Sequence, residues 1–133
     1  MLKCITSKTT YVTRMNCNLN ELVGNKIIKI TGLAKESETV RFSMENGDIC
    51  IFHHWQNCCE VVRLIDFEMS CNSLIGATIF KAVESSNEND NGNECSTWTF
   101  IKIETDKGGL WMRWLGESNC NYSESVELTI HKD

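Results

Sequence analysis

The chain has 133 residues, with 13 lysines and arginines against 18 aspartates and glutamates, and a formal net charge of −5 at pH 7. This length predicts a single domain over residues 1–133, and 41% hydrophobic residues suffice for a buried core. The acidic excess excludes general binding to nucleic acids or anionic membranes, because no surplus of cations is available to neutralise phosphates.

The N-terminal segment MLKCITSKTTYVTRM contains no apolar run of the secretory type, and no later stretch is apolar enough to cross a membrane. We therefore expect a cytoplasmic protein whose eight cysteines stay reduced and behave as small hydrophobic residues. No metal site is expected, since the chain has no Cys-x-x-Cys pair. Residues 1–19 are expected to form an N-terminal arm or, at Thr9–Thr13, an edge strand.

Short strands dominate the pattern in the first half of the chain. Apolar and polar residues alternate along Thr39–Glu45, and Asn46-Gly47 then predicts a tight hairpin turn that returns along Asp48–Phe52. Helix is expected only as single turns, at Leu19–Val23 and Asn72–Ile75, each followed by a glycine that suits a helix end.

The second half repeats this strand pattern with one polar interruption. The acidic, asparagine-rich segment Glu84–Glu94 predicts a solvated loop, either a mobile insertion or a partner-facing lid. A second hairpin follows, with strands at Thr97–Thr105 and Leu110–Trp114. The last strand is Ser125–His131, whose alternate apolar residues are expected to face the core.

An internal repeat organises these elements. Asn20–Lys29 reads NELVGNKIIK, and Asn72–Lys81 reads NSLIGATIFK. A hairpin and a polar loop follow each copy, so we infer two copies of a four-strand unit, at residues 20–64 and 72–128. Neither half can bury its apolar face alone, and the fold is therefore expected to be an all-β antiparallel sandwich or barrel with one shared core.

The two polar loops hold the candidate site. His54 and Cys58 have the chemistry of a Cys–His hydrolase, yet on an extended strand they would lie about 13 Å apart, too far for a hydrogen bond. His54 is otherwise expected to hydrogen-bond the loop backbone. Cys58 and the neighbouring Cys59 would point to opposite sides of an extended strand, one of them buried. Small polar groups beside aromatic rings suit a nucleotide, a sugar or a protein partner. The candidate binding residues are His54, Gln56, Asn57, Cys58, Glu60, Arg113, Trp114, Glu117, Ser118, Asn119 and Tyr122.

Four sequence segments carry a resemblance to a known family. They are HWQNCCEVV at His54–Val62, LIG at Leu74–Gly76, STWTF at Ser96–Phe100 and RWLGESN at Arg113–Asn119. This set resembles a small phage- and prophage-encoded family of unknown function. The chain departs from the family pattern at Asn57, where the pattern has aspartate, and at Cys120-Asn121, where it has glycine and tyrosine. The resemblance implies a viral accessory protein in the host bacterial cytoplasm and supplies no activity.

We expect a non-enzymatic inhibitor of a bacterial antiviral defence system, of the anti-CRISPR kind, that binds a host defence protein and needs no cofactor. One alternative is a sponge that sequesters a nucleotide immune signal, for which Arg63 and Arg113 are the available cations. Another is a cysteine-dependent hydrolase. A protein inhibitor requires an exposed acidic or aromatic patch, whereas a hydrolase requires a thiol within reach of His54. A homo-oligomer is compatible with each alternative.

Overall fold

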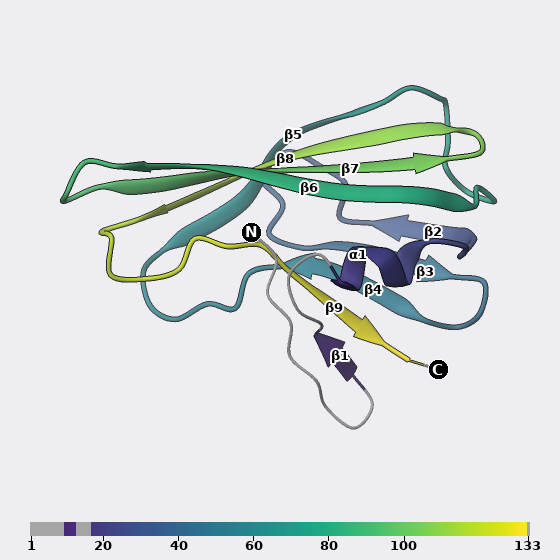
Figure 1. The fold of residues 1–133 in the computed structure, drawn as a ribbon, viewed down its shortest axis with the longest axis horizontal. Coiled ribbons are helices and arrows are strands. Elements are labelled where there is room, and N and C mark those ends of the chain that lie inside the picture. The colour runs from purple at the N-terminus through teal and green to yellow at the C-terminus, as the bar shows by residue number, and fades with distance from the viewer. Residues whose placement is uncertain (1–9, 13–16, 133) are drawn as a thin grey trace.

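The computed structural model describes residues 10–12 and 17–132, which form nine strands and one short helix, α1 (Cys17–Leu22). The first sheet has the strand order β1-β9-β4-β3-β2, and the second has the order β5-β8-β7-β6. The two sheets pack into the predicted all-β sandwich and do not close into a barrel (Figure 1). The strands are β1 (Thr10–Val12), β2 (Ile27–Thr31), β3 (Val40–Met44), β4 (Ile49–His53), β5 (Val61–Met69), β6 (Ile79–Asp90), β7 (Cys95–Thr105), β8 (Gly108–Ser118) and β9 (Glu127–His131).

The halves of the chain exchange their last strands. Strands β2, β3 and β4 form a meander in the first sheet, and β6, β7 and β8 form the same meander in the second. The fourth strand of each half then crosses over, so that β5 pairs with β8 and β9 pairs with β4. Each sheet is therefore completed by the other half of the chain, and the two halves share one core.

The repeated segments contact each other reciprocally. The Gly24 amide donates to the Ile79 carbonyl at 2.7 Å, and the equivalent Gly76 amide donates to the Ile27 carbonyl at 2.7 Å. Between them, Lys26 pairs with its own repeat equivalent, Thr78, in an isolated antiparallel bridge. Gly24 and Gly76 have φ values of +90° and +84°, a backbone conformation that favours glycine. The main-chain contacts at the centre of the molecule thus follow the sequence repeat.

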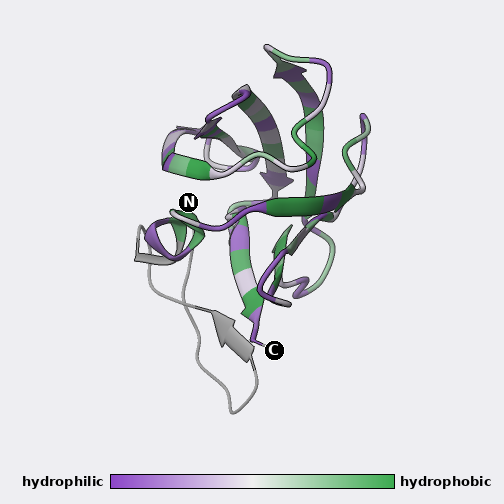
Figure 2. Cartoon of the chain, turned by 90° about the vertical axis from the view of Figure 1, so that its right-hand side faces the viewer, coloured by the Kyte–Doolittle hydropathy of each residue, from purple (hydrophilic) through white to green (hydrophobic). Residues whose placement is uncertain are grey.

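The core lies between the sheets and takes apolar side chains from both halves. Leu22 and its repeat equivalent Leu74 are both buried, as is Trp114 on β8. Figure 2 shows hydrophobic and hydrophilic bands succeeding one another along the strands, the alternation expected when one side of a sheet is packed and the other is solvated.

The acidic segment Glu84–Glu94 is a strand and a turn, and the prediction of a loop there was wrong. Strand β6 continues through Asp90, which pairs with Cys95, and only residues 91–94 turn the chain. Asparagine, aspartate and glutamate have low strand propensity, but cross-strand hydrogen bonding to β7 overrides that preference.

At the N-terminal end, the edge strand expected at Thr9–Thr13 is present as β1, which pairs with β9, while residues 1–9 and 13–16 lie outside the described part of the chain. The helical turn expected at Asn72–Ile75 does not form a helix. Within the described residues, no helix has the length and apolar character that a membrane crossing needs.

Candidate functional site

His54, the first residue after β4, lies between two buried carboxylates. Its Nε2 atom is 2.8 Å from Glu60 Oε2, and its Nδ1 atom is 2.6 Å from the Ser125 carbonyl oxygen and 3.6 Å from Glu127 Oε2. The His54 side chain is only 3% exposed, and both carboxylates are buried more completely. The predicted hydrogen bond from this histidine to the loop backbone is therefore one of three contacts, and Glu60 and Glu127 supply the other two.

These contacts keep His54 protonated at neutral pH. Burial by itself lowers the pKa of the imidazole, but hydrogen bonds with Glu127, Glu60 and the Ser125 carbonyl outweigh burial and raise it to about 9. Burial raises the pKa of Glu60, whereas His54 and the backbone N–H groups of Cys58, Asn57 and Glu60 itself lower it to about 2. The pair is thus an imidazolium and a carboxylate, and neither ring nitrogen is directed at a thiol as a general base would be.

Glu60 also shapes the loop that precedes it. Its carboxylate accepts hydrogen bonds from the N–H groups of Asn57 and Cys58, each at 2.8 Å. The Gln56 side-chain amide donates to the carbonyl oxygens of Cys58 at 3.1 Å and Glu60 at 2.5 Å. Of the predicted site residues in this loop, His54 and Glu60 therefore hold its shape, Gln56 braces it from the surface, and Asn57 and Cys58 remain exposed.

Cys58 and Cys59 lie on the same side of this loop. The chain bends here, so their sulfur atoms are 2.8 Å apart, with both residues exposed and neither in a disulfide. The predicted separation onto opposite sides, with one thiol buried, was wrong because it assumed an extended backbone. Cys59 lines a cavity of about 550 Å³ together with Ser118 and Asn119 of the second polar loop. The two polar loops predicted from the repeat thus meet beside the vicinal cysteines.

The second loop is organised by Glu124, the repeat equivalent of Glu60. Its carboxylate accepts hydrogen bonds from Thr97 Oγ1 at 2.7 Å and from Ser118 Oγ. Ser118 Oγ in turn accepts from the Cys120 N–H group at 3.0 Å. A carboxylate therefore braces each loop, and the predicted residues Glu117 and Asn119 stand exposed beside this bracing.

Cys95 and Cys120 form a disulfide that links the start of β7 to the loop after β8. The expectation that all the cysteines stay reduced was therefore wrong for this pair. Strand pairing places Cys95 opposite Ser118, close to Cys120, a proximity that the spacing of cysteines in the sequence does not reveal. Among the cysteines whose side chains the structure describes, Cys50, Cys58, Cys59 and Cys71 are free.

The described residues bring one possible metal-binding group together: Asp90, Cys95 and Cys120. Two of its three members are the sulfur atoms of the disulfide, so this group offers no thiolate ligands in the oxidised protein.

Two predicted binding residues lie elsewhere in the fold. Trp114 is fully buried opposite Leu64 in the core, so it cannot contact a ligand at the surface, and that prediction was wrong. Arg113 lies on β8 among the residues of a separate cavity, where its guanidinium donates to both carboxylate oxygens of Asp66 at 3.0 and 2.6 Å. Arg63 is likewise paired, with Glu36 and Glu117. Both arginines considered for a nucleotide phosphate are thus already neutralised by carboxylates.

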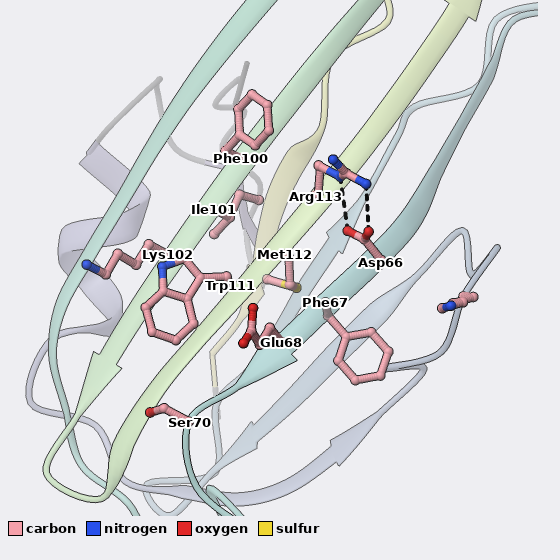
Figure 3. A pocket seen from close by; sticks show the side chains of 11 residues that line it. Asp66, Phe67, Glu68, Ser70, Phe100, Ile101, Lys102, Trp111, Met112 and Arg113 are labelled. Atoms are coloured by element: carbon pink, nitrogen blue, oxygen red, sulfur yellow. Dashed lines mark hydrogen bonds and ion pairs between the residues drawn. The ribbon is translucent and has the colours of Figure 1, made fainter.

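Arg113 belongs to a surface that we call the outer aromatic face: Phe100, Lys102, Trp111 and Arg113. These residues alternate along β7 and β8 with buried Ile101 and Met112, so their side chains lie on the side of the sheet turned away from the core. Phe100 and Trp111 are 40% and 41% exposed. They line a cavity of about 770 Å³ (Figure 3).

Two cations of this surface lie close to tryptophan rings, one of them Trp98 on β7. Lys102 Nζ is 5.4 Å from the Trp111 ring centroid, and the Arg113 guanidinium is 5.0 Å from that of Trp98. Phe100, Lys102 and Trp111 are not among the binding residues predicted from the sequence. The available signal was that outward positions of this predicted hairpin carry aromatic residues where polar residues are expected.

In a comparison with protein families, residues 20–128 match a domain of unknown function, DUF7448. Neither the curated proteins nor the solved structures include a match to the chain.

Proposed function

The chain belongs to the DUF7448 family, and we propose that it is a non-enzymatic binding protein that recognises another protein through its outer aromatic face. One observation carries the proposal. Phe100 and Trp111 are exposed, and they line one open cavity together with Lys102 and Arg113. Tryptophan and arginine are the residue types that contribute most often to the energetic centre of a protein interface.

The charge of this face favours a protein over a nucleotide or a nucleic acid. Three cations, Lys35, Lys102 and Arg113, line the cavity with two carboxylates, Asp66 and Glu68. Arg113 is paired with Asp66 and Lys102 with Glu104, and the whole chain carries a net charge of −5. A phosphate ligand would therefore have to compete with carboxylates for two of the three cations. A protein partner can instead cover the rings of Phe100 and Trp111 with apolar side chains. The Arg113–Asp66 ion pair would then lie at the polar rim of the interface.

We further propose that the partner is a bacterial antiviral defence protein and that the chain acts as a phage-encoded inhibitor in the host cytoplasm. The support is the resemblance of the HWQNCCEVV and RWLGESN segments to a phage- and prophage-encoded family, together with a small fold that presents an exposed face. Inhibition would result from covering a surface that the defence protein needs, so no chemical step is required of this chain.

The test is a plating assay in which the protein is expressed beside a panel of bacterial defence systems during phage infection. We expect wild-type protein to abolish protection by one system. Trp111→Ala and Phe100→Ala should restore that protection, and with the purified partner each should weaken binding roughly 30-fold, the effect of losing about 2 kcal/mol at an interface centre.

Trp55→Ala is the matched control, because Trp55 is a similarly exposed tryptophan next to the first polar loop. It should bind like wild type. If Trp55→Ala loses binding while Trp111→Ala keeps it, the polar loops are the interface and the outer aromatic face is not. If no system is inhibited, or a nucleotide is extracted from the purified protein, the proposed function is wrong.

A further inference from the structure

The exposed thiols of Cys58 and Cys59 have no part in the proposed protein-binding face. We propose that they form a bidentate site for a soft, thiophilic centre, meaning a trivalent metalloid or a soft metal ion held by two sulfur atoms. Thiolate sulfur is the ligand that such centres prefer over oxygen.

The geometry of the pair suits a single shared centre. The two sulfur atoms are 2.8 Å apart on the same side of the loop, and both residues are exposed. They line a cavity of about 460 Å³ together with Gln56 and Glu60. One ion or metalloid can therefore reach both sulfur atoms from solvent without a rearrangement of the core.

The loop that carries the thiols is fixed before any ligand arrives. Glu60 accepts the Cys58 N–H group, and Gln56 donates to the Cys58 carbonyl, so the peptide groups around the pair are held from both sides. Glu60 is itself anchored by buried His54. A site held in place in this way loses less conformational entropy on binding than two cysteines on a free loop.

The pair also remains available when another pair of cysteines is oxidised. Cys95 and Cys120 come from separate parts of the chain and are closed into a disulfide. Cys58 and Cys59 are adjacent in sequence, and a bond between them would create an eight-membered ring that strains the intervening peptide. In the structure the two thiols share a hydrogen bond and are not disulfide-bonded, so both sulfur atoms are reduced and can bind a ligand.

Cys50 and Cys71, the other two free cysteines whose side chains the structure describes, are poor competitors. Cys50 is buried, and burial raises the pKa of its thiol to about 12, which leaves it protonated at neutral pH. Cys71 is single and points its thiol at the Ser73 carbonyl oxygen at 3.4 Å. Neither can chelate.

Phenylarsine oxide is the probe, because its trivalent arsenic binds pairs of thiols. Two arsenic–sulfur bonds form, the arsenic–oxygen double bond breaks, and the oxygen leaves as water with the two thiol protons. Arsenic stays trivalent, so no oxidant or reductant is needed. We expect wild-type protein with its disulfide intact to bind one equivalent and to lose alkylation by iodoacetamide at Cys58 and Cys59 alone, as located by peptide mass mapping.

Cys58→Ser and Cys59→Ser should each weaken capture at least about 100-fold, because the second sulfur then no longer acts at high effective concentration. Cys71→Ser is the matched control and should bind like wild type. Gln56→Ala keeps both thiols and should weaken capture roughly tenfold through loss of bracing. Circular dichroism on each variant checks that it is folded.

Three results would overturn the site. Phenylarsine oxide could protect Cys71 from alkylation, or it could bind without protecting Cys58 or Cys59. Folded Cys58→Ser could also bind it as tightly as wild type. These results leave the proposed protein-binding face unaffected, because that face contains no cysteine.

Discussion

His54 is a buried cation whose two ring nitrogens are engaged by oxygen atoms, and this determines how it responds to pH. Its pKa is raised from 6.5 to about 9, so its contribution to stability is complete below pH 6.5 and is lost as the pH rises through 9. The pKa of Glu60 is lowered from 4.5 to about 2, so its contribution is complete above pH 4.5 and is lost as the pH falls through 2. The pair therefore stabilises the fold most between these limits.

The first prediction is that the free energy of unfolding of wild-type protein falls by about 3 kcal/mol between pH 6.5 and pH 10 because His54 loses its proton. Urea denaturation across this range measures the effect. His54→Gln should be less stable at pH 6 and should lack this fall. His131→Gln, at an exposed histidine, is the control and should keep the wild-type profile. Parallel profiles for wild type and His54→Gln would contradict the assignment of a buried imidazolium.

The second prediction concerns Leu74, a buried residue of the repeated segment. Leu74 is 1% exposed in the core, and its truncation to alanine should lower the free energy of unfolding by about 2–5 kcal/mol. The neighbouring Ile75 is 45% exposed, so Ile75→Ala should change stability by less than about 0.5 kcal/mol. Chemical denaturation of the two variants compares buried and exposed positions within one turn. Equal effects would show that the segment is not packed as described.

At the scale of elements, the disulfide joins the turn end of the β6–β7 hairpin to the loop after β8. Cys95 begins β7 and Cys120 follows β8, with a sequence separation of 25 residues. The third prediction is that Cys95→Ser combined with Cys120→Ser lowers the free energy of unfolding by about 3 kcal/mol, the chain-entropy effect of opening a loop of this length. Denaturation without reductant measures it, and Cys71→Ser serves as control. Free thiols at both positions in peptide mapping of the unreduced protein would contradict the pairing.

Local sequence predicted the strands better than it predicted their lengths or partners. The alternation in Thr39–Glu45 and the Asn46-Gly47 turn are local signals, and β3 and β4 follow them. The extension of β6 through Asp90 depends on hydrogen bonds to a strand later in the chain, so propensity alone pointed to a loop. The same reason explains Glu127, which strand alternation assigns to solvent. It is buried because His54 lies against its carboxylate and the Ser125 hydroxyl donates a hydrogen bond to it.

The candidate site was predictable only in part. The polar loops were identified from the repeat, and the structure does bring them together, since Cys59 lines one cavity with Ser118 and Asn119. The bend that places Cys58 beside Cys59 depends on Glu60 accepting backbone N–H groups, which has no signature in the spacing of residue types. The outer aromatic face was missed although Leu110, Met112 and Trp114 alternate with Trp111 in the sequence and so place it on the outward side of the predicted strand.

At the scale of the whole molecule, each half lacks the strand that completes its sheet. The fourth prediction is that residues 17–71 and residues 72–132, produced as separate chains, remain unfolded alone and fold when mixed, because β5 and β9 must each pair with the other fragment. Circular dichroism and size-exclusion chromatography measure this complementation. A 72–132 fragment carrying Leu128→Asp, which places a charge at a buried position of β9, should fail to complement. Stable folding of either wild-type fragment as a monomer would contradict the shared core.

The exchange of strands has a consequence for synthesis on the ribosome. The chain emerges from its N-terminal end, so β2, β3 and β4 are available long before β9, which pairs with the open edge of β4. During that interval the nascent chain presents an unpaired strand edge and apolar side chains, the features that lead to aggregation or recruit chaperones. Slow translation of the second half would lengthen this exposure, whereas slow translation after β9 would not. The yield of folded protein should therefore depend on codon usage between β4 and β9.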